Sequence, residues 1–335
     1  MIEMMGGILV PLLWVSMAEA AEPVPWYARD ECRMAYSTVM SADLAAGQSA
    51  ISQLQHSADL ELRTCGIWLE LPLCEIEMAL EGESPALTER RNERLEKLFK
   101  FAMHYGPRRP YLLDLAIEAR MRRIRLMVDR GDKGGALGEA RKVEKMLESR
   151  KDAPPNATRD YSRGVTLLAV SRAAWGLQAL LRMAGVRGDR KRGEELLEAL
   201  AEGHTVYQAD ALFLLYHFAR QNDKPGDQGV DRYGAKLILA YGQNPQFLFD
   251  RAVDQFRAGH CIDALATLQP ARSRLHDNPK LWTARVRKKV YWLTGRCALD
   301  TGDKPLAKKS LGLASQEKFG GYAEEVEILQ RDLSG

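Results

Sequence analysis

The sequence lacks the short motifs that mark the common enzyme classes. It contains no G-x-S-x-G nucleophile elbow, no H-E-x-x-H zinc motif and no glycine-rich phosphate-binding loop. His260, Cys261 and His276 come nearest to a metal-ligand set, but their spacing fits no standard zinc site. We therefore expect a non-catalytic protein without cofactor or metal, since an enzyme would need a site assembled from distant residues.

Cysteine and net charge are also scarce. The five cysteines form no C-x-x-C pair, which excludes a disulfide-rich scaffold, and their odd number leaves at least one thiol over: Cys32, Cys65, Cys74, Cys261 and Cys297. The 48 basic and 45 acidic residues give a net charge of +3, too small to indicate nucleic-acid binding. Basic segments at 187–192 and 285–289 leave peripheral contact with anionic lipid open, although such runs are usually solvated helix faces.

The first 20 residues predict a secretory signal peptide. An apolar run from Ile8 to Val15 precedes Ala18-Glu19-Ala20, which is an A-x-A cleavage pattern. The run has no Lys or Arg before it, so the positive segment typical of such signals is missing. We expect residues 1–20 to be removed and residues 21–335 to be periplasmic or secreted, where one or two disulfides can form.

The tripeptide Arg-Gly-Asp occurs twice, at 130–132 and 187–189, and a helical repeat explains both copies. Counted from these two glycines and from Gly259 and Gly302, the fifth following residue is always small: Ala136, Gly193, Ala264 and Ala307. This spacing predicts two helices joined by a tight glycine turn, with small residues where the helices cross. The aspartates then cap the second helices, so we do not expect an adhesion motif.

The same positions resemble the tetratricopeptide repeat, which has a small residue, a turn glycine, an alanine five positions on and a proline near its end. Asn244-Pro245 and Asn278-Pro279 lie 34 residues apart, and each proline is expected to open a helix. The segments 245–278 and 288–318 match best. The stretch 58–104 is expected to be a degenerate helix pair.

A more specific resemblance covers residues 164–300. Here Gly185-Val186-Arg187-Gly188-Asp189-Arg190 and Leu215-Tyr216-His217 stand where the eukaryotic mitochondrial outer-membrane and inclusion-body-clearance tetratricopeptide family has a G-F-x-G-D-R-like turn and a leucine-rich helix with Tyr-His. Val186 departs from the aromatic residue of that turn. The resemblance implies the fold and offers no catalytic residues.

We therefore expect one all-α domain. It would be an α-solenoid of about six or seven tetratricopeptide-like helix pairs, because no alternating strand pattern occurs along the chain. Degenerate repeats would cover residues 24–150, and better-defined repeats residues 158–333.

The first helices of such repeats line a continuous inner surface. The positions that the repeat family turns inward predict a basic and aromatic groove formed by Arg125, Trp175, Arg182, Phe249, Phe256, Lys289, Trp292 and Arg296. Guanidinium groups bind carboxylates and flat rings supply apolar contact, so we expect a scaffold for an acidic peptide or protein partner, including a C-terminal carboxylate. The plainer alternative is that these arginines simply lie along helix surfaces.

A lipid carrier is the second functional hypothesis. Residues 164–185 are apolar almost all round, interrupted by Arg172, Gln178 and Arg182. Because charges make a membrane span costly, a central helix covered by its neighbours explains the segment better. Apolar helices of this kind would instead enclose a lipid-sized cavity in the carrier hypothesis.

Overall fold

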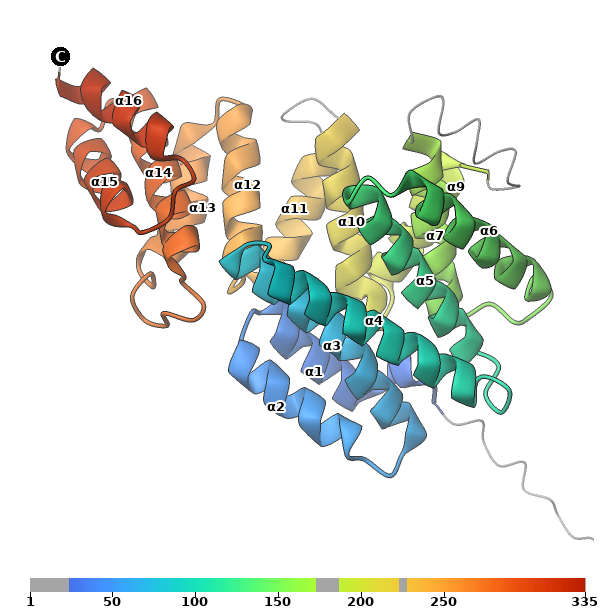
Figure 1. Ribbon diagram of the computed structural model, residues 1–335. Coiled ribbons are helices and arrows are strands. Elements are labelled where there is room, and N and C mark those ends of the chain that lie inside the picture. Colours follow the sequence, from blue (N-terminus) through green and yellow to red (C-terminus); the bar gives the residue numbers. More distant parts are fainter. Residues whose placement is uncertain (1–23, 173–186, 223–227, 335) are drawn as a thin grey trace, which may run out of the picture.

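The computed structural model describes residues 24–172, 187–222 and 228–334 (Figure 1). Within these ranges the chain forms 15 α-helices and one short 3-10 helix, η1 (Trp26–Ala28), and no strand, which confirms the all-α prediction. Neighbouring helices pack in succession, as is compatible with an α-solenoid. The predicted signal peptide, Trp175 and Arg182 lie outside the described residues.

The described helices follow one another along the chain (Figure 1). The described first half contains α1 (Asp30–Met40), α2 (Leu44–Gln55), α3 (Leu60–Glu81), α4 (Pro85–Tyr105), α5 (Leu112–Asp129), α6 (Lys133–Ser149) and α7 (Ala157–Arg172). The described second half contains α9 (Arg190–Glu202), α10 (Tyr207–Asn222), α11 (Gln228–Tyr241), α12 (Pro245–Arg257), α13 (Cys261–Arg272), α14 (Ala284–Asp300), α15 (Lys304–Gln316) and α16 (Ala323–Ser334).

The turn glycines serve two different needs. The backbone is left-handed at three of them, with φ of 78° at Gly131 and 81° at Gly259 and Gly302, as the pattern predicts. Gly188 differs, because its φ lies outside the left-handed region. A Cβ atom there would stand 2.3 Å from the backbone nitrogen of Ser171. In the second Arg-Gly-Asp copy, glycine is therefore required because the backbone of α7 lies so close to it.

The aspartates after the glycines are helix caps, as predicted. Each side chain accepts a hydrogen bond from the backbone N–H three residues further on, at 2.9–3.0 Å: Asp132 on α6, Asp189 on α9 and Asp303 on α15. These bonds satisfy donors that a helix start leaves unpaired. Both Arg-Gly-Asp copies therefore form the turn and the N-terminal cap that precede a helix.

Small residues lie where paired helices cross. A Cβ atom on Gly193 of α9 would come within 2.8 Å of the Leu168 side chain on α7. One on Gly295 of α14 would come within 2.6 Å of Leu311 on α15. The crossing alanines Ala264 and Ala307 are fully buried. Close backbone approach at the crossings is confirmed.

Only one of the two Asn-Pro pairs opens a helix. Pro245 begins α12, and the Asn244 side chain caps it by accepting the N–H of Gln246 at 2.9 Å. The same prediction for Asn278-Pro279 is wrong, since α14 begins at Ala284 behind a Thr283 cap. Asn278 closes a turn instead, because its backbone carbonyl accepts the N–H of Trp282, whose ring is buried.

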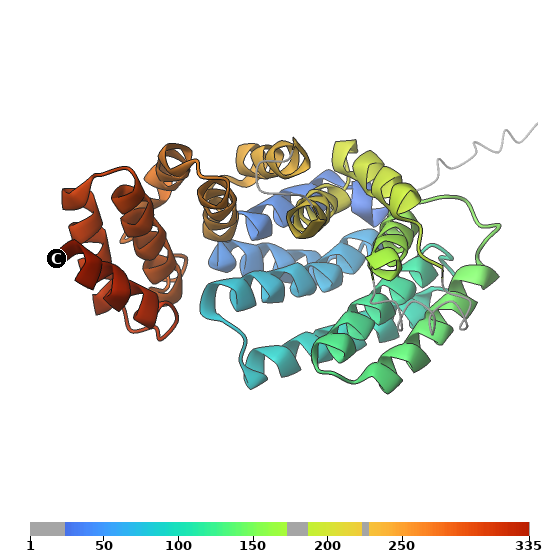
Figure 2. The same cartoon turned by 90° about the horizontal axis from the view of Figure 1, so that it is seen from above.

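The N-terminal helices contact distant parts of the chain, which an open solenoid does not do. Figures 1 and 2 show α1 and α3 on the side of the N-terminal helices that faces α10 and α12. Asn244 donates to the Met40 carbonyl at 2.7 Å, and Thr283 donates to the Leu80 carbonyl at the same distance. The N-terminal helices are therefore held against the starts of α12 and α14.

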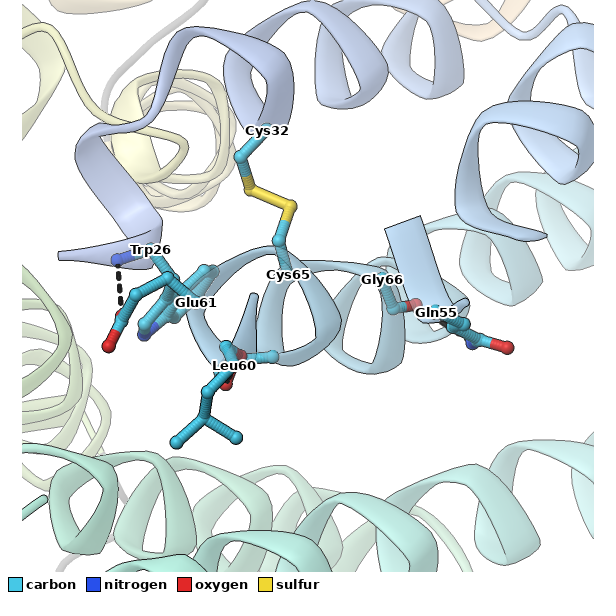
Figure 3. Close-up of a disulfide and its surroundings, with 8 residues drawn as sticks. Trp26, Cys32, Gln55, Leu60, Glu61, Cys65 and Gly66 are labelled. Carbon is cyan, nitrogen blue, oxygen red and sulfur yellow. Dashed lines mark hydrogen bonds between the residues drawn. A yellow bond between two sulfur atoms is a disulfide. The ribbon is translucent and has the colours of Figure 1, made fainter. Parts of the chain in front are cut away.

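A disulfide joins α1 to α3 (Figure 3). Cys32 and Cys65 form it, and both are fully buried. Close by, Glu61 of α3 accepts the backbone N–H of Trp26 at 2.9 Å. The pairing that the sequence left open is thus settled for two cysteines, while Cys74, Cys261 and Cys297 are free and buried.

Candidate functional site

The six predicted groove residues that the structure describes fall in two places. Arg125 of α5 is exposed and lines a cavity of about 100 Å³ between α3, α4, α5, α7 and α10. The other five lie on α12 and α14. The sequence pattern grouped all of them along one surface, but the fold separates Arg125 from the rest.

A buried ion cluster forms the wall beside Arg125. We call it the Arg122 cluster, and it consists of Glu75, Arg91, Glu118, Arg122 and Asp210. The Arg122 guanidinium donates to Glu118 at 2.9 Å, to Asp210 at 2.8 Å and to Glu75 at 3.3 Å. Arg91 donates to Glu75 at 3.3 Å. The cluster thus ties α3 and α4 to α5 and α10.

The carboxylates of the Arg122 cluster titrate differently because their surroundings differ. Burial raises the pKa of Glu118, although Arg122 and the hydrogen bonds from Tyr207 and Trp68 oppose the shift. Burial acts in the same direction on Glu75, but Arg122, Arg91 and Arg125 outweigh it and hold its pKa below the ordinary value. Glu75 therefore stays ionised more firmly than Glu118 does.

Glu118 of α5 is already bonded to other helices of the chain. It accepts hydrogen bonds from Trp68 of α3 at 2.9 Å and from Tyr207 of α10 at 2.6 Å. The Arg122 guanidinium is likewise bonded to three carboxylates of the same chain. Sequence reasoning did not single out Arg122, because its three acidic partners lie far apart in the chain.

The second place is the C-terminal basic-aromatic surface, formed by Phe249 and Phe256 of α12 and by Lys289, Trp292 and Arg296 of α14. Lys289 Nζ lies 5.2 Å from the centre of the Phe249 ring. The Arg296 guanidinium carbon lies 6.0 Å from the centre of the Phe256 ring. Trp292 sits between the two cations in the sequence of α14. Here the structure brings the predicted residues together as two cation-ring pairs.

Lys289 lacks a close counter-ion on this surface. Burial and the neighbouring Arg285 lower its pKa, although Asp250 pulls the other way. No carboxylate oxygen of the described residues lies within 4.0 Å of Lys289 Nζ, whereas Arg296 pairs with Asp300 at 3.5 Å. Asp250 instead accepts from Gln246 at 2.8 Å and pairs with Arg220 at 3.3 Å. Lys289 is a half-buried cation without a direct ion pair.

Tyr322 covers part of the same surface. Its ring stacks on Trp292 with centres 4.5 Å apart, and its backbone is left-handed with φ of 62°. The Trp292 indole N–H is buried and has no acceptor among the residues that the structure describes. Sequence reasoning missed Tyr322, and the signal that points to it is the preceding Gly320-Gly321, which marks a turn after α15.

A larger cavity of about 480 Å³ lies between α4 and α5, and none of the predicted site residues that the structure describes lines it. Glu93 and Glu96 line one side and Arg120 and Arg123 the other. The Arg120 guanidinium lies 4.3 Å from the centre of the Phe99 ring. Charged side chains of both signs thus line this cavity.

In the described ranges, no three His, Cys, Asp or Glu side chains gather as a metal site would require. None of the described helices has both the length and the apolar character of a membrane span. The chain matches no model of a protein family, and no curated protein or solved structure is significantly similar to it. The tetratricopeptide resemblance therefore remains a prediction from the sequence.

Proposed function

We propose that this protein is a non-catalytic scaffold that binds an acidic peptide segment of a partner protein on the C-terminal basic-aromatic surface. The observation that carries the proposal is the position of Lys289. It lies half-buried on the Phe249 ring without a carboxylate within 4.0 Å among the described residues. A carboxylate of a partner would supply the missing counter-ion.

The neighbouring groups favour the same class of ligand. Arg285 and Arg296 add positive charge on either side of Lys289 along α14, and Arg285 lies 5.7 Å from the centre of the Phe319 ring. The rings of Phe249 and Phe256 hold Lys289 and Arg296 in place, and the partly exposed Phe256 offers apolar area to a peptide. Affinity would come from a desolvated carboxylate with aromatic contacts around it.

Export is part of the proposal. The disulfide between Cys32 and Cys65 supports it, because such bonds persist mainly in oxidising compartments. The apolar run and the cleavage pattern in residues 1–20 support it independently. A partner is therefore sought in the cell envelope or in the secreted fraction.

Affinity capture from an envelope fraction tests the proposal. The wild-type chain is compared with Lys289→Glu and with Lys309→Glu, a matched charge reversal at an exposed lysine of α15. We expect the same partner band with wild type and control and its loss with Lys289→Glu. Peptides from that partner, with Glu and Asp or with Gln and Asn, then show whether binding needs the carboxylates.

Equal capture by both variants refutes the site. Capture that survives in the Gln and Asn peptides refutes the acidic ligand. Stoichiometric lipid in an organic extract of the purified chain, with no protein captured, favours the carrier hypothesis instead.

A further inference from the structure

Two of the three free cysteines meet between α13 and α14. Cys261 is the first residue of α13, and its thiol donates to the Asp300 carboxylate at 3.7 Å. Asp300 lies one turn beyond Cys297 on α14, and the Cys261 and Cys297 thiols are close enough to shift each other's pKa. Cys297 is fully buried and Cys261 is 7% exposed. The third free thiol, Cys74, contacts the Leu87 carbonyl in a separate cluster.

We propose that Cys261 and Cys297 are the site of a second disulfide, which joins α13 to α14 when the chain meets an oxidising disulfide. A bridge requires two sulfur atoms that meet across packed elements. Here α13 packs against α14, and the Cys261 thiol contacts Asp300, one turn from Cys297. The compartment that forms the Cys32–Cys65 bond supplies the oxidant. Cys74 would remain the one free thiol of the five cysteines.

The reaction is a pair of thiol-disulfide exchanges. The Cys261 thiol, the more exposed of the two, loses its proton and attacks an external disulfide such as oxidised glutathione. This forms a mixed disulfide at Cys261 and releases one reduced glutathione. The Cys297 thiol then loses its proton and attacks the Cys261 sulfur, which releases the second glutathione. Two protein thiols are oxidised and one glutathione disulfide is reduced to two thiols.

Burial of the two thiols slows this reaction at neutral pH. It raises the pKa of the Cys261 thiol, and burial together with the Cys261 thiol raises that of Cys297. Because the thiolate is the attacking species, we expect slow closure at neutral pH and about a tenfold faster rate for each pH unit below the thiol pKa. The bridge would fix α13 against the helix that carries Lys289, Trp292 and Arg296.

Oxidation of the purified full chain tests the proposal. The chain is reduced without denaturant, freed of reductant and incubated overnight with oxidised glutathione at pH 7 or pH 9. It is then quenched in acid, unfolded, blocked with N-ethylmaleimide and digested without reduction for mass spectrometry. We expect a linked peptide pair that contains Cys261 and Cys297, maleimide on Cys74 alone, and faster closure at pH 9. The Cys32–Cys65 pair in the same digest is the internal reference.

Two variants are matched controls. Cys74→Ser must still form the bridge, and Cys261→Ser must leave maleimide on Cys297. Maleimide or glutathione on both Cys261 and Cys297 after the pH 9 incubation overturns the proposal, and so does any linkage of either residue to Cys74.

Discussion

Replacing Arg122 by methionine tests how strongly the Arg122 cluster holds the fold together. The guanidinium is the common partner of Glu75, Glu118 and Asp210, and Glu118 is 1% exposed. Removing one member of a buried ion pair costs about 3–5 kcal/mol, since the remaining charge loses its partner in a poorly solvated place. We expect a loss of this size in the free energy of unfolding at pH 7, measured by urea denaturation with tryptophan fluorescence.

The pH dependence gives the same prediction a sign. The folded pKa of Glu118 is already raised by burial, and without Arg122 it rises further above the unfolded value. A group whose pKa is higher in the folded chain than in the unfolded chain stabilises the fold at pH values below its pKa in the unfolded chain. This stabilisation is lost as the pH rises through its pKa in the folded chain. The variant should therefore lie closest to wild type in mildly acidic solution and furthest from it at neutral pH.

Two further variants make the test specific. Arg125→Met removes the same charge from an exposed position one turn away, and we expect a change within about 0.5 kcal/mol. Adding Glu118→Gln to Arg122→Met should recover part of the loss, because the stranded buried charge is gone. A loss below about 1 kcal/mol for Arg122→Met at pH 7, or equal losses at positions 122 and 125, would refute the reasoning.

Other substitutions probe the crossings, the disulfide and the covered tryptophan. Cys32→Ser opens a bridge over a separation of 33 residues and should cost about 3–4 kcal/mol in urea unfolding, when compared with a wild-type chain whose Cys261 and Cys297 are kept reduced. Gly295→Val forces a methyl group toward Leu311 and should cost about 1–3 kcal/mol, whereas Gly312→Ala, with open space around it, should cost little. Tyr322→Ala uncovers Trp292, so the tryptophan emission should shift to the red and acrylamide quenching should increase; unchanged quenching contradicts the stacking.

Local features of the fold were predictable because backbone geometry leaves a short-range signature. A left-handed φ needs glycine, as at Gly131, and a helix start needs a side-chain acceptor, as at Asp132. Crossing helices need small residues at fixed offsets, as at Gly193. Each requirement involves only a few neighbouring residues, so it can be recognised without knowing the rest of the fold.

Long-range features left no such signature. Nothing near Asn278 in the sequence indicates that Trp282 is buried, and so the start of α14 was misplaced. The return of α1–α3 onto α10 and α12 depends on contacts about 200 residues apart, such as Asn244 with Met40. The Arg122 cluster was missed for the same reason, because Glu75 and Asp210 approach Arg122 only in the folded chain.

The position of α3 decides which predicted groove residues are free to meet a partner. An open solenoid leaves its inner surface to solvent along its whole length. Here Trp68 and Glu75 of α3 reach α5, so Glu118 and Arg122, which precede Arg125 on that helix, are already bonded within the chain. The contacts that α14 makes with the end of α3 lie at its start, through Thr283, so Lys289 and Arg296 lie beyond them.

It follows that charge reversal at the two places should have opposite outcomes. Lys289→Glu should abolish capture of the envelope partner, while Arg125→Glu, which changes an exposed charge to the same extent, should leave capture intact. Circular dichroism and urea midpoints for both variants show whether each chain is folded. If Arg125→Glu abolishes capture and Lys289→Glu does not, the partner binds beside α3, and the C-terminal basic-aromatic surface is not the binding site.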